Sequence, residues 1–334
     1  MRTSRRIFLM GGASSLACTD KRPRLNVFNW SAYIDPAMLT RFERARGVRI
    51  RYGNYESNEE MLARVMSGNS GWDIVFPTHS RLGPMASNGL LAKLDHQRLP
   101  GLSALDARFH SPVWDPELQW AVPYMWNGTG VAFNAQQVRG IDSWSALWRD
   151  DLRGRVTMLD DPEDVLGVCL LKLGLPFSSV NERDLRAARA EAIRQKQFLR
   201  AYLNAEVRDQ LVSGDVLAAQ LWSTTTAQAI AGNPALQFAW PREGFPLYCD
   251  CAAILRESGR YELAHEFLAY LLLPEVAAAN AKAAFTATVN GAGQSSDPVL
   301  YPSPEVYSRG FWPPALPSSA QRFRDRLWTE IKSA

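Results

Sequence analysis

From Leu25 onward, short apolar segments alternate with amphipathic ones, and this alternation constrains the fold more than any other feature of the sequence. Strands are expected at 25–29, 48–53, 72–76, 155–159, 216–221, 236–240 and 251–255. Asp35 and Pro36 are typical of the start of a helix, and Gly47 is typical of its end. Because strands that alternate with helices form βαβ units, the sequence predicts an α/β fold with a largely parallel sheet.

The division of the chain into lobes follows from its length and from the order of its expected helices and strands. Further helices are expected from Asn58, from Pro162, over 182–203, over 261–273, from Pro274 and up to Trp328. Two strands are expected within 118–134, interrupted by Pro123 and by the Gly-Thr-Gly run at 128–130. A chain of 334 residues exceeds the size of one ordinary hydrophobic core, which predicts two lobes. With a first crossing near 133–136, the expected boundaries are 24–133 with 247–290 for lobe 1, and 134–246 with 291–334 for lobe 2.

Residues 1–17 have the composition of an export signal. Three arginines and no acid accompany an apolar stretch at 7–17, which is too short to span a bilayer permanently. The run SRRIFL at 4–9 is similar to the twin-arginine export signal, and SLAC, which ends at Cys18, is similar to a bacterial lipoprotein box. We therefore expect a periplasmic protein that is anchored by a lipid on Cys18. Cleavage as an ordinary signal peptide is the alternative.

Composition and motifs exclude several classes of function. Removal of the leader takes away three arginines and brings the formal charge from +3 to about zero, so nothing indicates nucleic-acid binding. No later segment holds about 18 uninterrupted apolar residues, so the mature chain is not expected to cross a membrane. Without a G-x-S-x-G elbow, a Walker loop, a dinucleotide fingerprint or an H-E-x-x-H motif, no enzyme activity and no cofactor are predicted. Thr78, His79 and Ser80 offer a hydroxyl and a base, but such residues after a strand commonly serve as caps and turns.

Three cysteines remain after the leader, namely Cys169, Cys249 and Cys251. The last two flank Asp250 on an expected strand, so both thiols point to one face, opposite the carboxylate. A metal site would need further ligands, and the four histidines show no ligand spacing. The thiols are interpreted as small buried apolar groups, and no metal is predicted.

Aromatic side chains gather at the ends of the expected strands, where α/β sheets bind ligands. The relevant residues are Trp30, Tyr33, Trp222 and Tyr248. Aromatic walls shed water from methylene groups and offer cation–π contacts, while carboxylates bind ammonium groups by charge-assisted hydrogen bonds. The combination favours an alkylammonium ligand, although a tryptophan taken alone is more often a core residue.

The acidic residues have structural interpretations as well. Asp161 and Asp164 stand three apart at the start of an expected helix, as an N-cap and its capping-box partner do. Capping and cation binding are compatible, because a helix N-terminus keeps carboxylates ionised. Asp250 lies among apolar residues and needs a partner, which is either an internal arginine or an external cation.

Several segments carry a resemblance to a known family. They are NWSAYI at 29–34, YESNE at 55–59, WDIVFP at 72–77, PYMW at 123–126, SWSALW at 143–148, LDDPEDV at 159–165, WPREG at 240–244, YLLLPEV at 270–276 and WTEIK at 328–332. The chain resembles the polyamine (putrescine and spermidine) binding proteins of bacterial ABC importers over 25–332. The resemblance implies a type II periplasmic binding fold, with two α/β lobes, a crossover hinge and an interlobe cleft. It also implies a monomer that captures a small cationic amine and delivers it to an ABC permease and its ATPase subunits.

Carried over residue by residue, the resemblance also implies a ligand site. Its members are Trp30, Ser31, Tyr33, Thr78, Asp161, Asp164, Trp222, Tyr248 and Asp250. Trp30 and Tyr33 would form one aromatic wall and Trp222 the facing wall, while the aspartates would hold ammonium groups.

The sequence also departs from the family pattern. Ala32 and Thr225 stand where family members have acids, and Thr286 stands where they have a tyrosine. Fewer acids lower the charge that neutralises an amine, so a mono-cationic or amino-acid-like solute in the same fold is the alternative. A basic side chain in the cleft would favour an anionic ligand, and Arg81 and Arg242 are the nearest candidates. A ligand-sensing receptor that is not coupled to transport is a third hypothesis.

Overall fold

The computed structural model describes residues 21–334, so the expected export signal and Cys18 lie outside the described residues. The strands are β1 (Arg24–Trp30), β2 (Arg49–Tyr55), β3 (Ile74–Val75), β4 (Ala121–Asn134), β5 (Val156–Met158), β6 (Leu199–Tyr202), β7 (Ala218–Trp222), β8 (Leu236–Ala239), β9 (Phe245–Ile254), β10 (Ala287–Thr288) and β11 (Gly310–Phe311). The α-helices are α1 (Pro36–Arg46), α2 (Asn58–Met66), α3 (His79–Ser87), α4 (Pro162–Lys172), α5 (Glu182–Gln195), α6 (Val207–Ser213), α7 (Ser223–Gly232), α8 (Tyr261–Leu271), α9 (Pro274–Ala284), α10 (Pro304–Tyr307) and α11 (Ser318–Ser333). Short 3-10 helices lie at His96–Arg98, Pro100–Ala104, Ala107–Phe109, Trp144–Trp148, Asp150–Leu152 and Gly291–Gly293.

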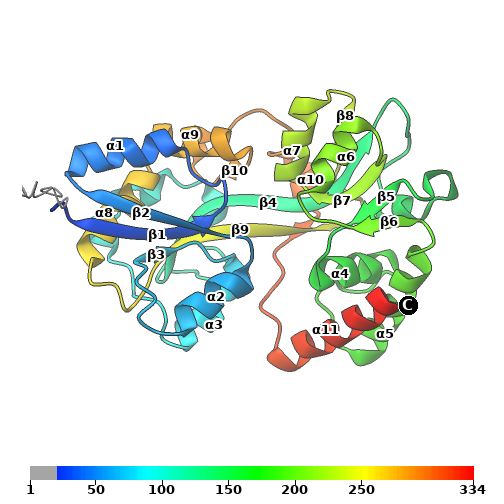
Figure 1. The fold of residues 1–334 in the computed structure, drawn as a ribbon, viewed down its shortest axis with the longest axis horizontal. Coiled ribbons are helices and arrows are strands. Elements are labelled where there is room, and N and C mark those ends of the chain that lie inside the picture. The colour runs from blue at the N-terminus through cyan, green and yellow to red at the C-terminus, as the bar shows by residue number, and fades with distance from the viewer. Residues whose placement is uncertain (1–20) are drawn as a thin grey trace, which may run out of the picture.

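Two lobes are connected by the long strands β4 and β9 (Figure 1). Helices α1, α2, α3, α8 and α9 surround the strands of lobe 1, and α4, α5, α6, α7 and α11 surround those of lobe 2 (Figure 1). Buried apolar side chains form one large cluster that continues from lobe 1 into lobe 2, with a smaller cluster around β7, α6 and α7. Within residues 21–334, no helix combines the length and the apolar character that a bilayer crossing requires.

The strands form a mixed sheet in the order β2-β1-β3-β9-β4-β7-β5-β6. β1 runs parallel to β2 and β3, and β5 runs parallel to β6 and β7. β9 is antiparallel to β3 and β4, and β4 is antiparallel to β7, β8 and β10. The prediction of a largely parallel sheet is confirmed at both outer ends and is wrong at the centre. The chain leaves lobe 1 along one central strand and returns along its neighbour, which makes that pair antiparallel.

β4 is one continuous strand, where two strands were expected. Its first part pairs with β9, and from Thr129 onward it pairs with β7 and β8. A Cβ added at Gly130 would lie 2.5 Å from the ring of Phe238 and 2.6 Å from the carbonyl oxygen of Ala239. The glycine at this position therefore permits close packing of β8 and does not end the strand.

The helix termini follow the predicted chemistry, with one exception. The Asp35 side chain accepts a hydrogen bond from the backbone nitrogen of Ala37 at 2.8 Å, and Gly47 ends α1 with a φ of 64°. The exception is the helix expected over 182–203. The helix α5 ends at Gln195, and most of the last residues of the expected range belong to β6. β6 pairs in parallel with β5, so sheet pairing overrides the local helical pattern.

Candidate ligand-binding site

Strand β9 carries the first element of the site, the carboxylate of Asp250. This side chain is 6% exposed, and it accepts hydrogen bonds from the hydroxyl groups of Tyr33 at 2.8 Å and Thr78 at 2.9 Å. Burial raises the pKa of Asp250 to about 6, while the two hydroxyl donors act in the opposite direction. In the part of the chain that the structure describes, no lysine or arginine pairs with this carboxylate. Its negative charge is therefore available to an external cation.

Lobe 2 contributes a second buried carboxylate, Asp164 in the first turn of α4. It is 4% exposed, and its Oδ1 accepts hydrogen bonds from the hydroxyl groups of Thr129 and Tyr248, both at 3.1 Å. Burial raises the pKa of Asp164 well above its ordinary value, and the neighbouring charges of Asp161 and Glu163 add to this effect. Since Tyr248 and Asp250 stand two apart on β9, one face of this strand connects the polar groups of both lobes.

Asp161 is the N-cap of α4, as the sequence predicts. Its Oδ1 accepts hydrogen bonds from the backbone nitrogens of Glu163 at 2.7 Å and Asp164 at 3.0 Å. Burial raises the pKa of Asp161, and these backbone donors lower it. Capping uses one carboxylate oxygen, which leaves the second oxygen of Asp161 for a ligand.

Two charged residues beside this cluster were not among the predicted site residues, namely Glu163 and Arg324. Burial and the charge of Asp161 raise the pKa of Glu163 to about 7, while Arg324 and Arg81 lower it. The guanidinium of Arg324 is fully buried and donates hydrogen bonds to the carbonyl oxygens of Phe177 at 2.9 Å and Ser179 at 3.1 Å. Arg324 and Glu163 are 161 residues apart in sequence, so no local pattern relates them.

The remaining predicted site residues lie at neighbouring strand ends but direct their hydrogen bonds elsewhere. Trp30 is half-buried, and its indole nitrogen donates to the carbonyl oxygen of Phe76 at 2.8 Å. Ser31 is exposed, and its hydroxyl donates to Glu56. Trp222 ends β7 and is half-buried. The structure thus brings Tyr33 and Thr78 together with Asp250, and Tyr248 together with Asp164, whereas Trp30, Ser31 and Trp222 share no hydrogen bond with these groups.

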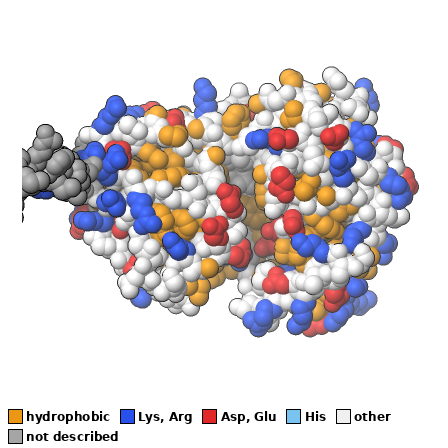
Figure 2. All heavy atoms as spheres, viewed as in Figure 1, with side chains coloured by type: hydrophobic (Ala, Val, Ile, Leu, Met, Phe, Trp, Pro, Cys, Tyr) orange, Lys and Arg blue, Asp and Glu red, His pale blue; other side chains and the backbone are white. Residues whose placement is uncertain are grey.

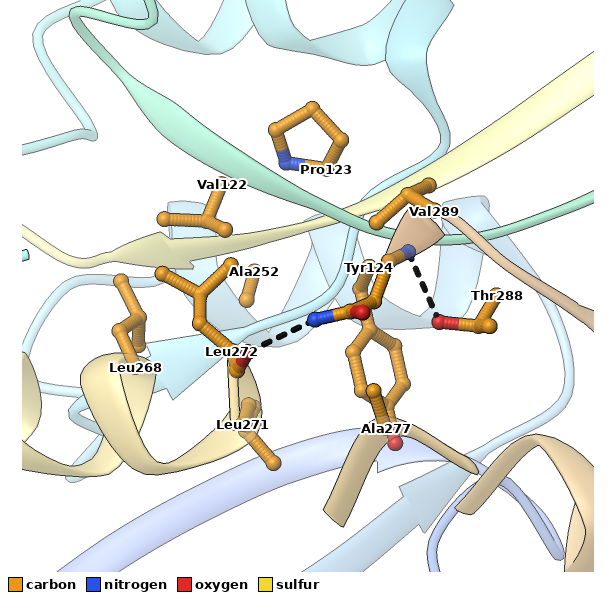
Figure 3. A pocket seen from close by; sticks show the side chains of 11 residues that line it. Val122, Pro123, Tyr124, Ala252, Leu268, Leu271, Leu272, Ala277, Thr288 and Val289 are labelled. Carbon is orange, nitrogen blue, oxygen red and sulfur yellow. Dashed lines mark hydrogen bonds between the residues drawn. The ribbon is translucent and has the colours of Figure 1, made fainter. Parts of the chain in front are cut away.

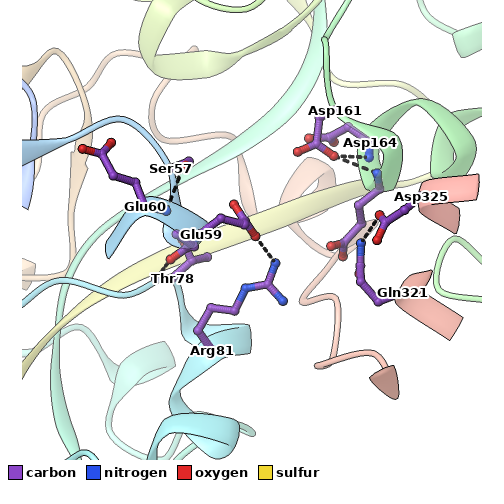
Figure 4. Close-up of polar contacts among 11 residues, drawn as sticks. Ser57, Glu59, Glu60, Thr78, Arg81, Asp161, Asp164, Gln321 and Asp325 are labelled. Atoms are coloured by element: carbon purple, nitrogen blue, oxygen red, sulfur yellow. Dashed lines mark hydrogen bonds and ion pairs between the residues drawn. The ribbon is translucent and has the colours of Figure 1, made fainter. Parts of the chain in front are cut away.

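A hollow runs between the two lobes, and acidic side chains line both of its walls (Figure 2). Glu59 and Arg81 of lobe 1 lie across this cleft from Asp161 and Asp164 of lobe 2 (Figure 4). Arg81 and Glu59 form an ion pair with an N–O distance of 3.1 Å. The cleft therefore contains an excess of carboxylates and one arginine of lobe 1.

The positions that depart from the family pattern supply no charge to the cleft. Ala32 is exposed, and Thr225 is buried on α7. The hydroxyl of Thr286 lies 2.8 Å from that of Thr224. Arg242 forms an exposed ion pair with Asp142 at 2.9 Å.

An enclosed cavity inside lobe 1 is too small for a solute. Val122, Tyr124 and Leu272 are among the side chains that line it (Figure 3). Its volume is about 10 Å³, which is the space of a single water molecule. Among residues 21–334, no group of three His, Cys, Asp or Glu side chains is arranged to hold a metal ion.

The cysteines are placed as the sequence predicts. Cys169, Cys249 and Cys251 are buried thiols, and the sulfur atoms of the last two lie 3.8 Å apart on one face of β9. Burial raises the pKa of Cys251 well above its ordinary value, so this thiol is neutral at physiological pH.

Comparison with known proteins assigns the chain to a family. It is 30% identical to the putrescine-binding periplasmic protein SpuD of Pseudomonas aeruginosa, over 97% of this chain and 96% of the relative. It is 27% identical to the spermidine/putrescine-binding periplasmic protein of Escherichia coli, over 89% of this chain and 88% of the relative. The solved structure of the Tp0655 (TpPotD) lipoprotein of Treponema pallidum superposes with a TM-score of 0.85 at 26% identity and covers 92% of this chain and 99% of that one.

These likenesses confirm the two-lobe type II periplasmic binding fold. The family model of the bacterial extracellular solute-binding proteins matches residues 37–299. Proteins of this family bind solutes and are not enzymes, in agreement with the prediction of no catalytic activity. The chain therefore belongs to the bacterial extracellular solute-binding proteins.

Proposed function

We propose that this protein is a periplasmic receptor that captures a small cationic amine of the putrescine and spermidine type for ABC-type import. The names of its relatives support this ligand class. The observation that carries the proposal is Asp250, a buried carboxylate that is held by two neutral hydroxyl groups and has no cationic partner within residues 21–334. Because a buried charge is costly without a counter-charge, an ammonium group of the ligand is the partner that this site lacks.

In this proposal the ligand lies in the cleft with one ammonium group at Asp250 and the other at Asp161 and Asp164. Its methylene groups lie against aromatic side chains, and hydroxyl groups complete the site. These further residues are Trp30, Ser31, Tyr33, Thr78, Trp222 and Tyr248. A ligand that contacts both lobes stabilises the closed arrangement and shifts the population toward it.

The receptor acts as a monomer and delivers the amine to a permease and its ATPase subunits. Its lobes comprise 24–133 with 247–290 and 134–246 with 291–334. A lipid on Cys18 anchors it at the periplasmic face of the membrane, after removal of a signal at 1–17. The name of the Treponema relative, which is a lipoprotein, supports the anchor.

Isothermal titration of the chain from residue 19 onward tests the ligand class. Putrescine, cadaverine, agmatine and spermidine are the ligands, and 1,4-butanediol is the uncharged control of putrescine's length. The double variant Asp164→Asn/Asp250→Asn should weaken diamine binding by at least about a hundredfold, since each charge-assisted hydrogen bond contributes about 1.5–3 kcal/mol. Asp209→Asn, which removes an exposed carboxylate, is the matched control. Absence of heat and of a thermal shift with every amine at millimolar concentration would contradict the proposal.

A further inference from the structure

We propose that Arg81 is a specificity-determining residue that favours dicationic over tricationic amines, because it engages the carboxylates that a third ammonium group would need. The inference rests on the proposed function, since it concerns which amine the same cleft accepts. It also assigns a role to a basic side chain of lobe 1 that lies opposite Asp161 and Asp164 of α4 (Figure 4).

The position of Arg81 is set by lobe 1. It lies in the first turn of α3, and its guanidinium is 3.1 Å from the carboxylate of Glu59 near the start of α2. The Arg81 side chain is 25% exposed, whereas that of Glu59 is 72% exposed. Within residues 21–334, the buried Nε of Arg81 has no hydrogen-bond partner. Lobe 1 therefore satisfies only part of the donor capacity of this guanidinium.

The charge of Arg81 also acts on lobe 2. Burial raises the pKa of both Asp161 and Glu163, Glu59 raises it further, and Arg81 lowers it. No side chain in the described part of the molecule donates a hydrogen bond to the carboxylate of Glu163. Arg81 of lobe 1 thus acts across the cleft on Asp161 and Glu163.

The carboxylates of the cleft fall into two sets. Asp250 and Asp164 accept hydrogen bonds from neutral hydroxyl groups alone and serve the two ends of a diamine. Glu59 and Glu163 both lie within the field of Arg81. A triamine carries one more ammonium group, which would find Glu59 already paired with Arg81 and would face the like charge of this guanidinium. Because an unpaired ammonium group in a partly buried cleft is costly, the diamine is favoured.

Variants at Arg81 test this inference through the ratio of the dissociation constants of spermidine and putrescine, measured by isothermal titration. Arg81→Gln should lower this ratio by about tenfold, which corresponds to one weak charge-assisted hydrogen bond gained by spermidine. Arg81→Lys keeps the charge and should leave the ratio within about twofold of the wild type. Arg41→Gln is the matched control, because Arg41 pairs with Glu275 of the same lobe at the same distance of 3.1 Å.

Two further variants keep the test independent of how well Arg81→Gln folds. Glu59→Gln changes an exposed side chain and leaves Arg81 without its ion pair, so it should raise the ratio. In the double variant Arg81→Gln/Glu163→Gln, the released carboxylate is also removed, and the ratio should return toward the wild-type value. Thermal midpoints of all variants establish that they are folded.

The outcomes separate this inference from the proposed function. Two results overturn the inference and leave the proposed function standing. One is amine binding by Arg81→Gln with an unchanged ratio of the two dissociation constants, and the other is a wild type that binds spermidine as tightly as putrescine. A wild type that prefers 4-aminobutyrate to putrescine assigns Arg81 to a ligand carboxylate and also overturns it. A wild type that binds no amine removes both.

Discussion

Replacement of Asp250 by asparagine should stabilise the unliganded protein and weaken amine binding. The folded protein raises the pKa of this carboxyl from 3.8 to about 6, mainly through burial. Each pKa unit corresponds to about 1.4 kcal/mol, so the ionised carboxylate destabilises the folded state by about 3 kcal/mol. For an acid whose pKa is raised on folding, the stabilising contribution is present below pH 4 and is lost as the pH rises through 6. The advantage of the asparagine variant should therefore grow over this interval.

The geometry of the site allows asparagine to fit. Its amide oxygen accepts a hydrogen bond from one of the two hydroxyl groups of Tyr33 and Thr78, which lie 2.8 and 2.9 Å from the carboxylate, and its amide nitrogen donates to the other. The packing is therefore retained and the charge alone is removed. The loss of that charge should weaken diamine binding by at least about tenfold.

Urea unfolding without ligand at pH 4 and pH 8 measures this effect. The difference in the free energy of unfolding between Asp250→Asn and the wild type should be up to about 3 kcal/mol larger at pH 8 than at pH 4. Asp209→Asn, which removes an exposed carboxylate, is the control for the loss of a surface charge. An Asp250→Asn difference that is equal at the two pH values would refute the reasoning, because it would show that Asp250 carries no desolvation cost.

Three further predictions concern protons, aromatic walls and packing. Diamine binding near pH 7 should release a proton, because burial raises the pKa of Asp164 well above its ordinary value and an ammonium group favours the ionised form. Titrations in buffers of different ionisation enthalpy measure this release, which Asp164→Asn should reduce, and equal heats in all buffers would contradict it. Trp222→Ala should weaken binding by about tenfold with little change in thermal midpoint. Trp30→Ala should also lower the midpoint, because the indole nitrogen of Trp30 donates a hydrogen bond to the carbonyl oxygen of Phe76 at 2.8 Å. An equal loss of thermal midpoint in Trp222→Ala and Trp30→Ala would contradict this difference between the two tryptophans. Gly130→Ala should lower stability by about 1–3 kcal/mol in urea unfolding, since the new Cβ would lie 2.5 Å from Phe238. An unchanged urea midpoint would mean that β8 shifts to accommodate the new Cβ without a loss of stability.

The parts of the fold that local chemistry decides could be predicted from the sequence. Asp35 and Asp161 cap helices because their side chains reach backbone nitrogens two or three residues ahead. Two of the misjudged elements depend on distant partners. The short strand after α5 is a strand because β5 lies beside it, and Gly130 belongs to a continuous strand because β8 packs against it.

The candidate site also combines residues that the sequence predicts with contacts that only the fold shows. Asp250 could be selected from the sequence because an acid on an apolar strand needs a partner, and Tyr33 lies at the end of another strand. The hydroxyl partners that hold it are visible only in the fold. Arg81 is a candidate for a basic residue in the cleft and Glu163 belongs to an acidic segment, but only the fold shows that Arg81 lies across the cleft from the start of α4.

The position of β9 in the sheet has a consequence for biosynthesis. Val75 of β3 pairs with Ala253 of β9, so the middle of the first lobe is completed by residues synthesised roughly 180 positions later. At about 5–20 residues per second, the early strands wait on the order of ten seconds or more for this neighbour. Until then β3 presents an open edge with unpaired amide and carbonyl groups, to which other chains can add. The sheet of the first lobe therefore cannot be completed until β9 has been synthesised.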